Sequence, residues 1–155
     1  MDSAQERPPY EAYAVIAGSF AGLLATAGAL GRLLDRDPQC QTALDFAILA
    51  LASFKAARTL THDRVSAPMR APFVEGEADA HDEVPVRGGG MQQALGELVT
   101  CTRCVGTWTA AGLASTQIVA PRVGRLLTWS LGAAGANDFL QAGFTALKGK
   151  ANEPD

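Results

Sequence analysis

The sequence predicts an all-α, polytopic membrane protein with four transmembrane helices in an antiparallel bundle, formed by a single membrane domain over residues 1–155. Three observations lead to this fold class. Hydrophobic residues make up 48% of the chain and charged residues 19%, so the apolar content is high for this length. The apolar residues occur in long blocks between very polar segments. The sequence also lacks the strict alternation of apolar and polar residues that marks a half-buried strand.

The first helix is expected over residues 12–34. The segment from Ala12 to Gly31 has no charged residue and is about as long as the ~20 residues needed to cross a hydrocarbon core. The segment MDSAQERPPYE before it has mixed charge, and RLLDRDP after it offers no Ala-x-Ala cleavage site. We therefore expect a retained transmembrane helix and not a signal peptide. The alternative is an Ala/Gly-rich core helix of a soluble bundle.

The three other helices are expected over residues 42–60, 95–120 and 123–147. Each has a few charged residues within an otherwise apolar segment. Short connections at Asp37-Pro38 and Pro121 make neighbouring helices antiparallel. The connection over residues 61–94 is long and polar, and we expect it to be a cytoplasmic loop.

The distribution of basic residues predicts that both termini are cytoplasmic, because Lys and Arg resist translocation across the membrane. In this orientation nine basic residues lie inside and four outside. The inner set is Arg7, Lys55, Arg58, Arg64, Arg70, Arg87, Arg103, Lys148 and Lys150, and the outer set is Arg32, Arg36, Arg122 and Arg125. Cys40 then lies in an outer loop with no second cysteine on that side, as a free or accidental thiol.

Charged residues within the expected helices predict a polar cluster in the inner half of the bundle. Asp138 lies about ten residues before the end of its helix, or ~15 Å deep at ~1.5 Å per residue. A charge in a membrane-spanning helix costs about 2.5–3.5 kcal/mol on insertion scales, so it normally faces the interior and is paired. We expect Lys55 to pair with Asp138 or Glu97. The alternative is that Lys55, Arg58 and Arg103 extend to the membrane interface.

Other charged residues have simpler expected roles. Asp45 is expected to be a first-turn acid that interacts favourably with the helix dipole, and a pairing with Arg125 is the alternative. Arg70 is expected to contact lipid headgroups or Glu97. The acidic segment over residues 75–83 is expected to be solvated and mobile.

Cys101 and Cys104 form a CxxC pair in the third helix, and three roles are open. A zinc site needs four ligands, and the sequence offers these thiolates and His62 but no second CxxC, so zinc is only a candidate cofactor. A redox pair is chemically reasonable, because Arg103 and the start of a helix both stabilise a thiolate. The third role is packing by two small side chains. In the reducing cytoplasm a structural disulfide is not expected.

Glycine spacing predicts close helix contacts. Gly18 and Gly22 form a GxxxG motif, which lets helix backbones approach closely. Further glycines that could serve in this way are Gly28, Gly132, Gly135 and Gly143. The contacts could lie within the chain, with a protein partner, or with a second copy in a homo-oligomer. Membrane lipids are also expected partners, whereas nucleic acid is not.

A set of polar and small residues resembles the domain-of-unknown-function 1360 family, small bacterial integral membrane proteins of which one is labelled a sporulation protein. The residues are Asp45, Lys55, Arg58, Thr61, Asp63, Pro68, Arg70, Pro72, Phe73, Gly96, Glu97, Cys101, Cys104, Gly106 and Trp108. The resemblance covers roughly residues 45–108, and the first and last helices match only in kind. It implies a bacterial membrane protein, with no activity attached, and favours one site formed by Lys55, Arg58, Asp63, Arg70, Glu97, Cys101 and Cys104.

The sequence therefore predicts a small structural or accessory subunit of a bacterial inner membrane. It would bind a protein partner or lipid through its helix faces and the inner polar cluster of Lys55, Arg58, Asp63, Arg70, Glu97 and Asp138. A membrane thiol-redox protein using Cys101 and Cys104 is the alternative, and a metal-binding or transport protein comes third. No nucleophile or acid–base pair suggests a catalysed reaction, so an enzyme is not the leading expectation.

Overall fold

The structure is a computed structural model that describes residues 8–36, 41–76 and 83–151. Its described part is all-α apart from one short antiparallel pairing of two-residue strands. The helices are α1 (Tyr10–Leu33), α2 (Ala43–His62), η1 (Arg64–Ser66), α3 (Ala67–Arg70), α4 (Gly90–Thr100), α5 (Thr102–Val119) and α6 (Pro121–Ala151). The strands are β1 (Val74–Glu75) and β2 (Val84–Pro85), with Val74 opposite Pro85. The strands lie in the loop between α2 and α4, where the sequence analysis expected none.

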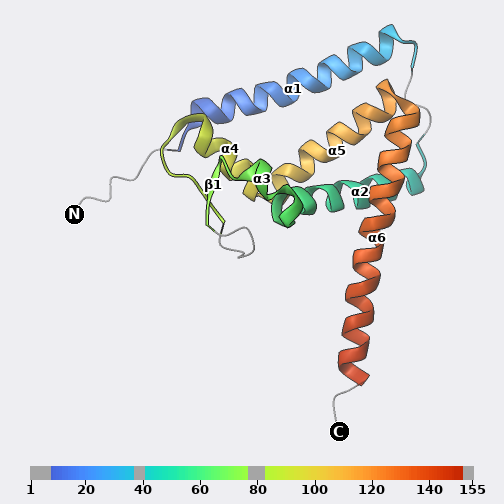
Figure 1. Cartoon of the computed structure of the whole chain (residues 1–155). Helices are drawn as coiled ribbons and strands as arrows, with labels where there is room; N and C mark the ends of the chain where they lie inside the picture. Colours follow the sequence, from blue (N-terminus) through green and yellow to red (C-terminus); the bar gives the residue numbers. More distant parts are fainter. Residues whose placement is uncertain (1–7, 37–40, 77–82, 152–155) are drawn as a thin grey trace.

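The long helices alternate in direction along the chain. α1 and α5 run the same way, because Phe20 contacts Trp108 and, further along both helices, Gly31 lies against Ile118. α2 runs against α5, where the hydroxyl of Thr109 donates to the carbonyl oxygen of Ser53 over 3.1 Å. α6 turns back after Pro121 and crosses α2 in the same sense, because Gly132 lies against Ile48 and, further along both helices, Gly135 lies against Leu51. Figure 1 shows α1 lying along α4 and α5, and α6 crossing α2.

The helices pack through small side chains, and large apolar side chains point outward. The buried hydrophobic residues in the described part of the chain are Ala12, Ala52, Ala57, Ala94, Val105 and Leu113. Large apolar side chains such as Leu23, Phe46 and Leu140 are 62%, 70% and 72% exposed. Beyond Asp138 every residue of α6 is exposed, and this half of the helix extends away from the other helices (Figure 1).

The segment expected as one helix over residues 95–120 is divided at Cys101. The backbone of Cys101 is extended (φ −94°, ψ 98°), so α4 ends at Thr100 and α5 begins at Thr102. The sulfur of Cys101 caps α5 by accepting the backbone N–H of Cys104 over 3.3 Å. A free N–H group at a helix start needs such an acceptor. The CxxC spacing therefore marks a helix start inside the apolar segment.

Among the helices that the structure describes, α1 is the one that is both long enough and apolar enough to cross a membrane by composition. Only 6% of its most apolar window is buried. A core helix of a soluble bundle would be covered by its neighbours, so this exposure does not fit that alternative. The same composition also occurs in signal sequences near an N-terminus.

Candidate functional site

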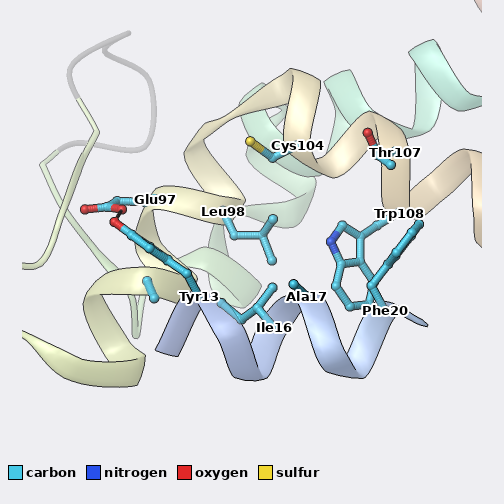
Figure 2. Close-up of a pocket in the computed structure, with 10 residues that line it drawn as sticks. Tyr13, Ile16, Ala17, Phe20, Glu97, Leu98, Cys104, Thr107 and Trp108 are labelled. Carbon is cyan, nitrogen blue, oxygen red and sulfur yellow. Dashed lines mark hydrogen bonds between the residues drawn. The ribbon is translucent and has the colours of Figure 1, made fainter. Parts of the chain in front are cut away.

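A pocket of about 390 Å³ lies between α1 on one side and α4 and α5 on the other. It is lined by Tyr13, Ile16, Ala17, Phe20, Ala94, Glu97, Leu98, Cys104, Thr107 and Trp108. Figure 2 shows Tyr13, Ile16, Ala17 and Phe20 rising from α1 toward Leu98 and Trp108 on the opposite wall.

One end of the pocket is polar. The hydroxyl of Tyr13 donates to Glu97 Oε2, and Gln93 Nε2 donates to Glu97 Oε1 over 3.0 Å. Glu97 is therefore held by α1 and by its own helix, and its partner is Tyr13 where the sequence analysis expected Lys55 or Arg70. Tyr13 was not predicted as a site residue, and no spacing in the sequence links it to Glu97.

The other end of the pocket is aromatic. Phe20 and Trp108 meet edge to face, with ring centroids 5.0 Å apart and an interplanar angle of 68°. Figure 2 shows the indole nitrogen of Trp108 on the side of its ring that faces Leu98. No described residue accepts a hydrogen bond from this indole N–H. This end of the pocket thus offers a flat apolar wall and a donor.

Cys101 and Cys104 are joined as a disulfide with Cα atoms 5.2 Å apart, and Cys104 lines the pocket. This differs from the expectation of two reduced thiols. That expectation rested on the reducing cytoplasm, whereas the local fold favours the bond: Cys101 caps α5 and Cys104 lies in its first turn, so their sulfurs meet. Cys40 lies outside the described residues.

The structure gives no support to a metal centre in its described part. No group of three or more His, Cys, Asp or Glu side chains lies together there. His62 Nε2 lies 3.2 Å from the hydroxyl of Thr102, and that hydroxyl is 3.1 Å from that of Thr61. The candidate ligand His62 is therefore oriented toward threonines beside the cysteine pair, and the two cysteines bind each other.

Lys55 and Asp138 form the ion pair that the sequence analysis expected. Lys55 Nζ lies 2.9 Å from Asp138 Oδ2, and the side chains are 25% and 35% exposed. The pair joins α2 to α6 one turn beyond Gly135, where an added Cβ would lie 2.6 Å from the carbonyl oxygen of Leu51. Arg58, one turn further along α2, is exposed and has no ion-pair partner among the described residues.

Arg70 is the centre of a separate buried network and is only 2% exposed. Its guanidinium donates to both carboxylate oxygens of Glu83, over 2.8 and 3.0 Å. It also donates to the carbonyl oxygens of Leu60 and Asp63 and to the hydroxyl of Ser66. Leu60 lies in the last turn of α2, Asp63 follows that helix directly and Ser66 ends η1, so Arg70 fixes the loop to α2. Asp63 takes part through its main chain.

Glu83 corrects the sequence analysis. It stands at the end of an acidic segment that was expected to be solvated, yet it is the counter-ion of a buried arginine. The residues 77–82 of that segment lie outside the described part of the chain. One signal was present: Arg70 stands among small and apolar residues in the segment SAPMRAPFV, and a buried arginine needs a carboxylate.

The polar residues expected to form one cluster are distributed over three contacts. Lys55 and Asp138 join α2 to α6, Arg70 and the Asp63 main chain hold the loop, and Glu97 faces α1. Asp45 lies in the first turn of α2, as expected, and it also forms a capping box with Thr42, which was not predicted. Of the predicted glycines, Gly132 and Gly135 make close contacts, whereas Gly18, Gly22, Gly28 and Gly143 face open space.

Comparison with known proteins gives two matches. The sequence profile of a family described as "Protein of unknown function (DUF1360)" matches residues 48–144. The chain is also 36% identical over 104 residues to the sporulation protein YjcA of Bacillus subtilis (strain 168). The aligned region covers 63% of this chain and 88% of that protein. The profile match includes most of α6, which the sequence analysis had left out of the resemblance, and begins after α1. No solved structure matches the chain.

Proposed function

This chain belongs to the DUF1360 family, and from that premise we propose that it is an integral protein of a bacterial inner membrane with four membrane-spanning segments. The spans would be α1, α2, α4 with α5, and α6. In this membrane it would act as a small accessory subunit that binds a protein partner. It would also bind lipid through its apolar outer surface.

One observation supports this proposal above the others: large apolar residues lie outside and small residues lie inside. Soluble proteins rarely expose apolar patches of more than a few hundred Å². Here α1 exposes Val15, Leu23, Leu24, Leu30 and Leu33 along its length. Lipid tails are a suitable solvent for such a surface, and small residues at the contacts are typical of helix association in membranes.

The proposed orientation has both termini in the cytoplasm. The alternating helix directions are compatible with it, and the basic residues favour it. Arg70 and Glu83 would then lie in a cytoplasmic loop, where their network stabilises the connection between α2 and α4. Lys148 and Lys150, at the exposed end of α6, would lie at the inner surface.

The proposed partner surface is the outward face of α1. Ala14, Gly18, Gly22, Ala25 and Ala29 recur at intervals of three or four residues and are all exposed. They lie opposite the face that contains Ala12 and Gly31, which pack against the rest of the chain. A face of small residues lets a second membrane helix approach closely.

Membrane placement is tested by fractionation of cells that make the full chain, followed by alkaline extraction and reporter fusions at each connection. We expect the chain to resist extraction and cytoplasmic reporters to be active at both ends and in the loop 61–94. A soluble chain, or a reporter pattern that places the termini on opposite sides, would contradict the four-span proposal.

The partner surface is tested by a photo-crosslinking amino acid at Ala21, beside the face, in living cells. We expect a protein adduct whose yield falls several-fold with Gly22→Leu, because the leucine blocks close approach. Ser19→Leu is the control, since Ser19 is exposed on the same helix but points to a different side from Ala21 and the small-residue face. Adducts with lipid alone would show that this face of α1 is in contact with the bilayer.

A second candidate function is thiol–disulfide exchange within the membrane. It is favoured by one observation, the Cys101–Cys104 disulfide on the wall of an apolar pocket. Mass-tagging of thiols in cells, before and after reduction, tests it. A redox protein populates both the dithiol and the disulfide and shifts between them with growth conditions. A pair that stays in one state under all conditions is structural.

A further inference from the structure

We propose that the pocket between α1 and the α4–α5 wall holds an acyl chain of an aminophospholipid, whose primary ammonium group binds the carboxylate of Glu97. The inference rests on the membrane placement proposed above and names the class of lipid that this site takes. Three features carry it: a long apolar pocket, a carboxylate without a counter-ion at one end, and the position of that end at the start of α1.

The lining side chains follow one another along α1. Tyr13 lies at the polar end and Phe20 at the aromatic end, which are about 10 Å apart along the helix at ~1.5 Å per residue. Ile16 on α1 and Leu98 on the opposite wall lie between the two ends (Figure 2). An occupant that reaches both ends must therefore be narrow and flexible, as an acyl chain is.

The apolar part of the pocket holds a chain but does not choose between lipids. Ile16, Ala17 and Leu98 provide aliphatic surface, and Phe20 and Trp108 provide aromatic surface. Ala17 is exposed, so the pocket opens on the side where the proposed placement puts lipid. Lipid tails are as apolar as these side chains, so all acyl chains enter with a similar gain. Any preference between lipids must therefore come from the headgroup.

Glu97 is the group that distinguishes between headgroups. Its carboxylate accepts hydrogen bonds from the neutral side chains of Tyr13 and Gln93, and no described Lys or Arg forms an ion pair with it. A primary ammonium group would supply the missing charge together with N–H donors, the combination that gives strong hydrogen bonds. A choline headgroup has no N–H donor. A phosphoglycerol headgroup brings negative charge, and none of the described lining residues is Lys or Arg.

The polar end of the pocket lies at the depth of lipid headgroups. Tyr13 is in the first turn of α1, which begins at the inner surface in the proposed orientation. Tyr10 meets Tyr13 edge to face, with ring centroids 6.3 Å apart, and tyrosine is enriched at membrane–water interfaces. Figure 2 shows the Tyr13 hydroxyl and the Glu97 carboxylate at the end away from Trp108. An ammonium group on Glu97 thus lies in the headgroup layer, and the chain extends inward toward Trp108.

The test measures quenching of Trp108 by lipids with a dibrominated acyl chain, because bromine quenches tryptophan only at short range. The full chain with Trp129→Phe, which removes the other of the two tryptophans, is placed in mixed micelles with brominated phosphatidylethanolamine, phosphatidylcholine or phosphatidylglycerol. We expect the ethanolamine lipid to associate about tenfold more strongly than the other two, a difference of about 1.4 kcal/mol. Trp129 in a Trp108→Phe background is the control, because it is 51% exposed on α6 and should be quenched equally by all three lipids.

Glu97→Gln tests the headgroup contact, because it removes the charge and keeps the size of the side chain. We expect the preference for the ethanolamine lipid to disappear. Glu11→Gln is the matched control, since Glu11 is an exposed acid in the first turn of α1 and does not line the pocket. A preference that survives Glu97→Gln, or that Glu11→Gln abolishes equally, would overturn the ammonium contact.

Ala17→Phe tests the pocket, because the added ring takes up space that the chain would occupy. We expect quenching of Trp108 by the ethanolamine lipid to fall to the level of the other two lipids. Ser19→Phe adds the same ring at an exposed position of α1 outside the lining, and the preference should remain. Equal quenching by all three lipids in the parent chain would mean ordinary contact with the bilayer and would reject the inference. Membrane placement is judged separately by fractionation, and a chain that passes that test fails this one if no headgroup is preferred.

Discussion

α2 and α6 pack closely where they meet, and we call this contact the closed seam. α1 and α5 leave a pocket between them, and we call this contact the open seam. Gly132 and Gly135 bring the backbone of α6 against Ile48 and Leu51, and the Lys55–Asp138 pair follows at the same contact. In the other seam Tyr13, Phe20 and Trp108 line the pocket between the helices. In this comparison glycines lie at the tight contact between α2 and α6, whereas aromatic residues line the pocket between α1 and α5.

The largest expected effect lies outside both seams, in the loop that joins α2 to α4, and is that of Arg70→Ala. The substitution leaves the carboxylate of Glu83 buried and unpaired, along with the main-chain acceptors at the end of α2. Breaking a buried ion pair from one side costs about 3–5 kcal/mol. Equilibrium unfolding of the purified chain in mixed micelles measures this loss.

Arg87→Ala is the control for Arg70→Ala, since Arg87 is exposed in the same connection. A loss below about 1 kcal/mol, the range of a surface ion pair, would mean that Arg70 is solvated and not the centre of a buried network.

The closed seam is tested by Gly135→Leu. A Cβ at this position would lie 2.6 Å from the carbonyl oxygen of Leu51, so the helices must separate. Overpacking of this kind typically costs about 1–3 kcal/mol, which we expect to find by the same unfolding measurement. Gly143→Leu adds the same side chain to the same helix where nothing lies within 4 Å, and it should have little effect. Equal losses in the two variants would remove the evidence for a tight seam.

The ion pair of the closed seam should contribute less. Asp138→Asn leaves Lys55 without its counter-ion, but the side chains are 25% and 35% exposed, so solvation reduces the loss. We expect about 1 kcal/mol, near the upper end for exposed pairs. The double variant Lys55→Met with Asp138→Leu separates pairing from burial of charge. It should be less destabilised than the sum of its single variants, and strict additivity would show that the pair does not interact.

Prediction from sequence succeeded where a residue interacts with residues close to it in the chain. The position of Asp45 in the first turn of α2 and the helical character of the long apolar segments follow from local spacing. The Lys55–Asp138 pair followed from one long-range assumption, that a charge within an apolar helix seeks an opposite charge. The all-α class needed no knowledge of helix contacts.

The rest required knowledge of which helices touch. Glu97 could have met Lys55, Arg70 or α1, and only the placement of α4 beside α1 selects Tyr13. The pocket was not foreseen, because the spacing of Phe20 and Trp108 along the chain says nothing of their contact. Glu83 was misjudged because its acidic neighbours set the expectation for the whole segment.

The open seam should be the least sensitive to loss of packing, and Phe20→Leu tests this. The variant removes the edge-to-face contact with Trp108, where the centroids are 5.0 Å apart. Aromatic pairs contribute about 0.5–1.5 kcal/mol beyond burial, and because the pocket already leaves space beside Phe20 we expect a loss near 0.5. Phe46→Leu, at a position that is 70% exposed, is the control in the same unfolding measurement. A loss as large as that of Gly135→Leu would mean that α1 is packed against α5 as tightly as α2 against α6. The pocket would then be a packing defect within a structural seam, and its aromatic walls would hold the fold together instead of admitting a ligand.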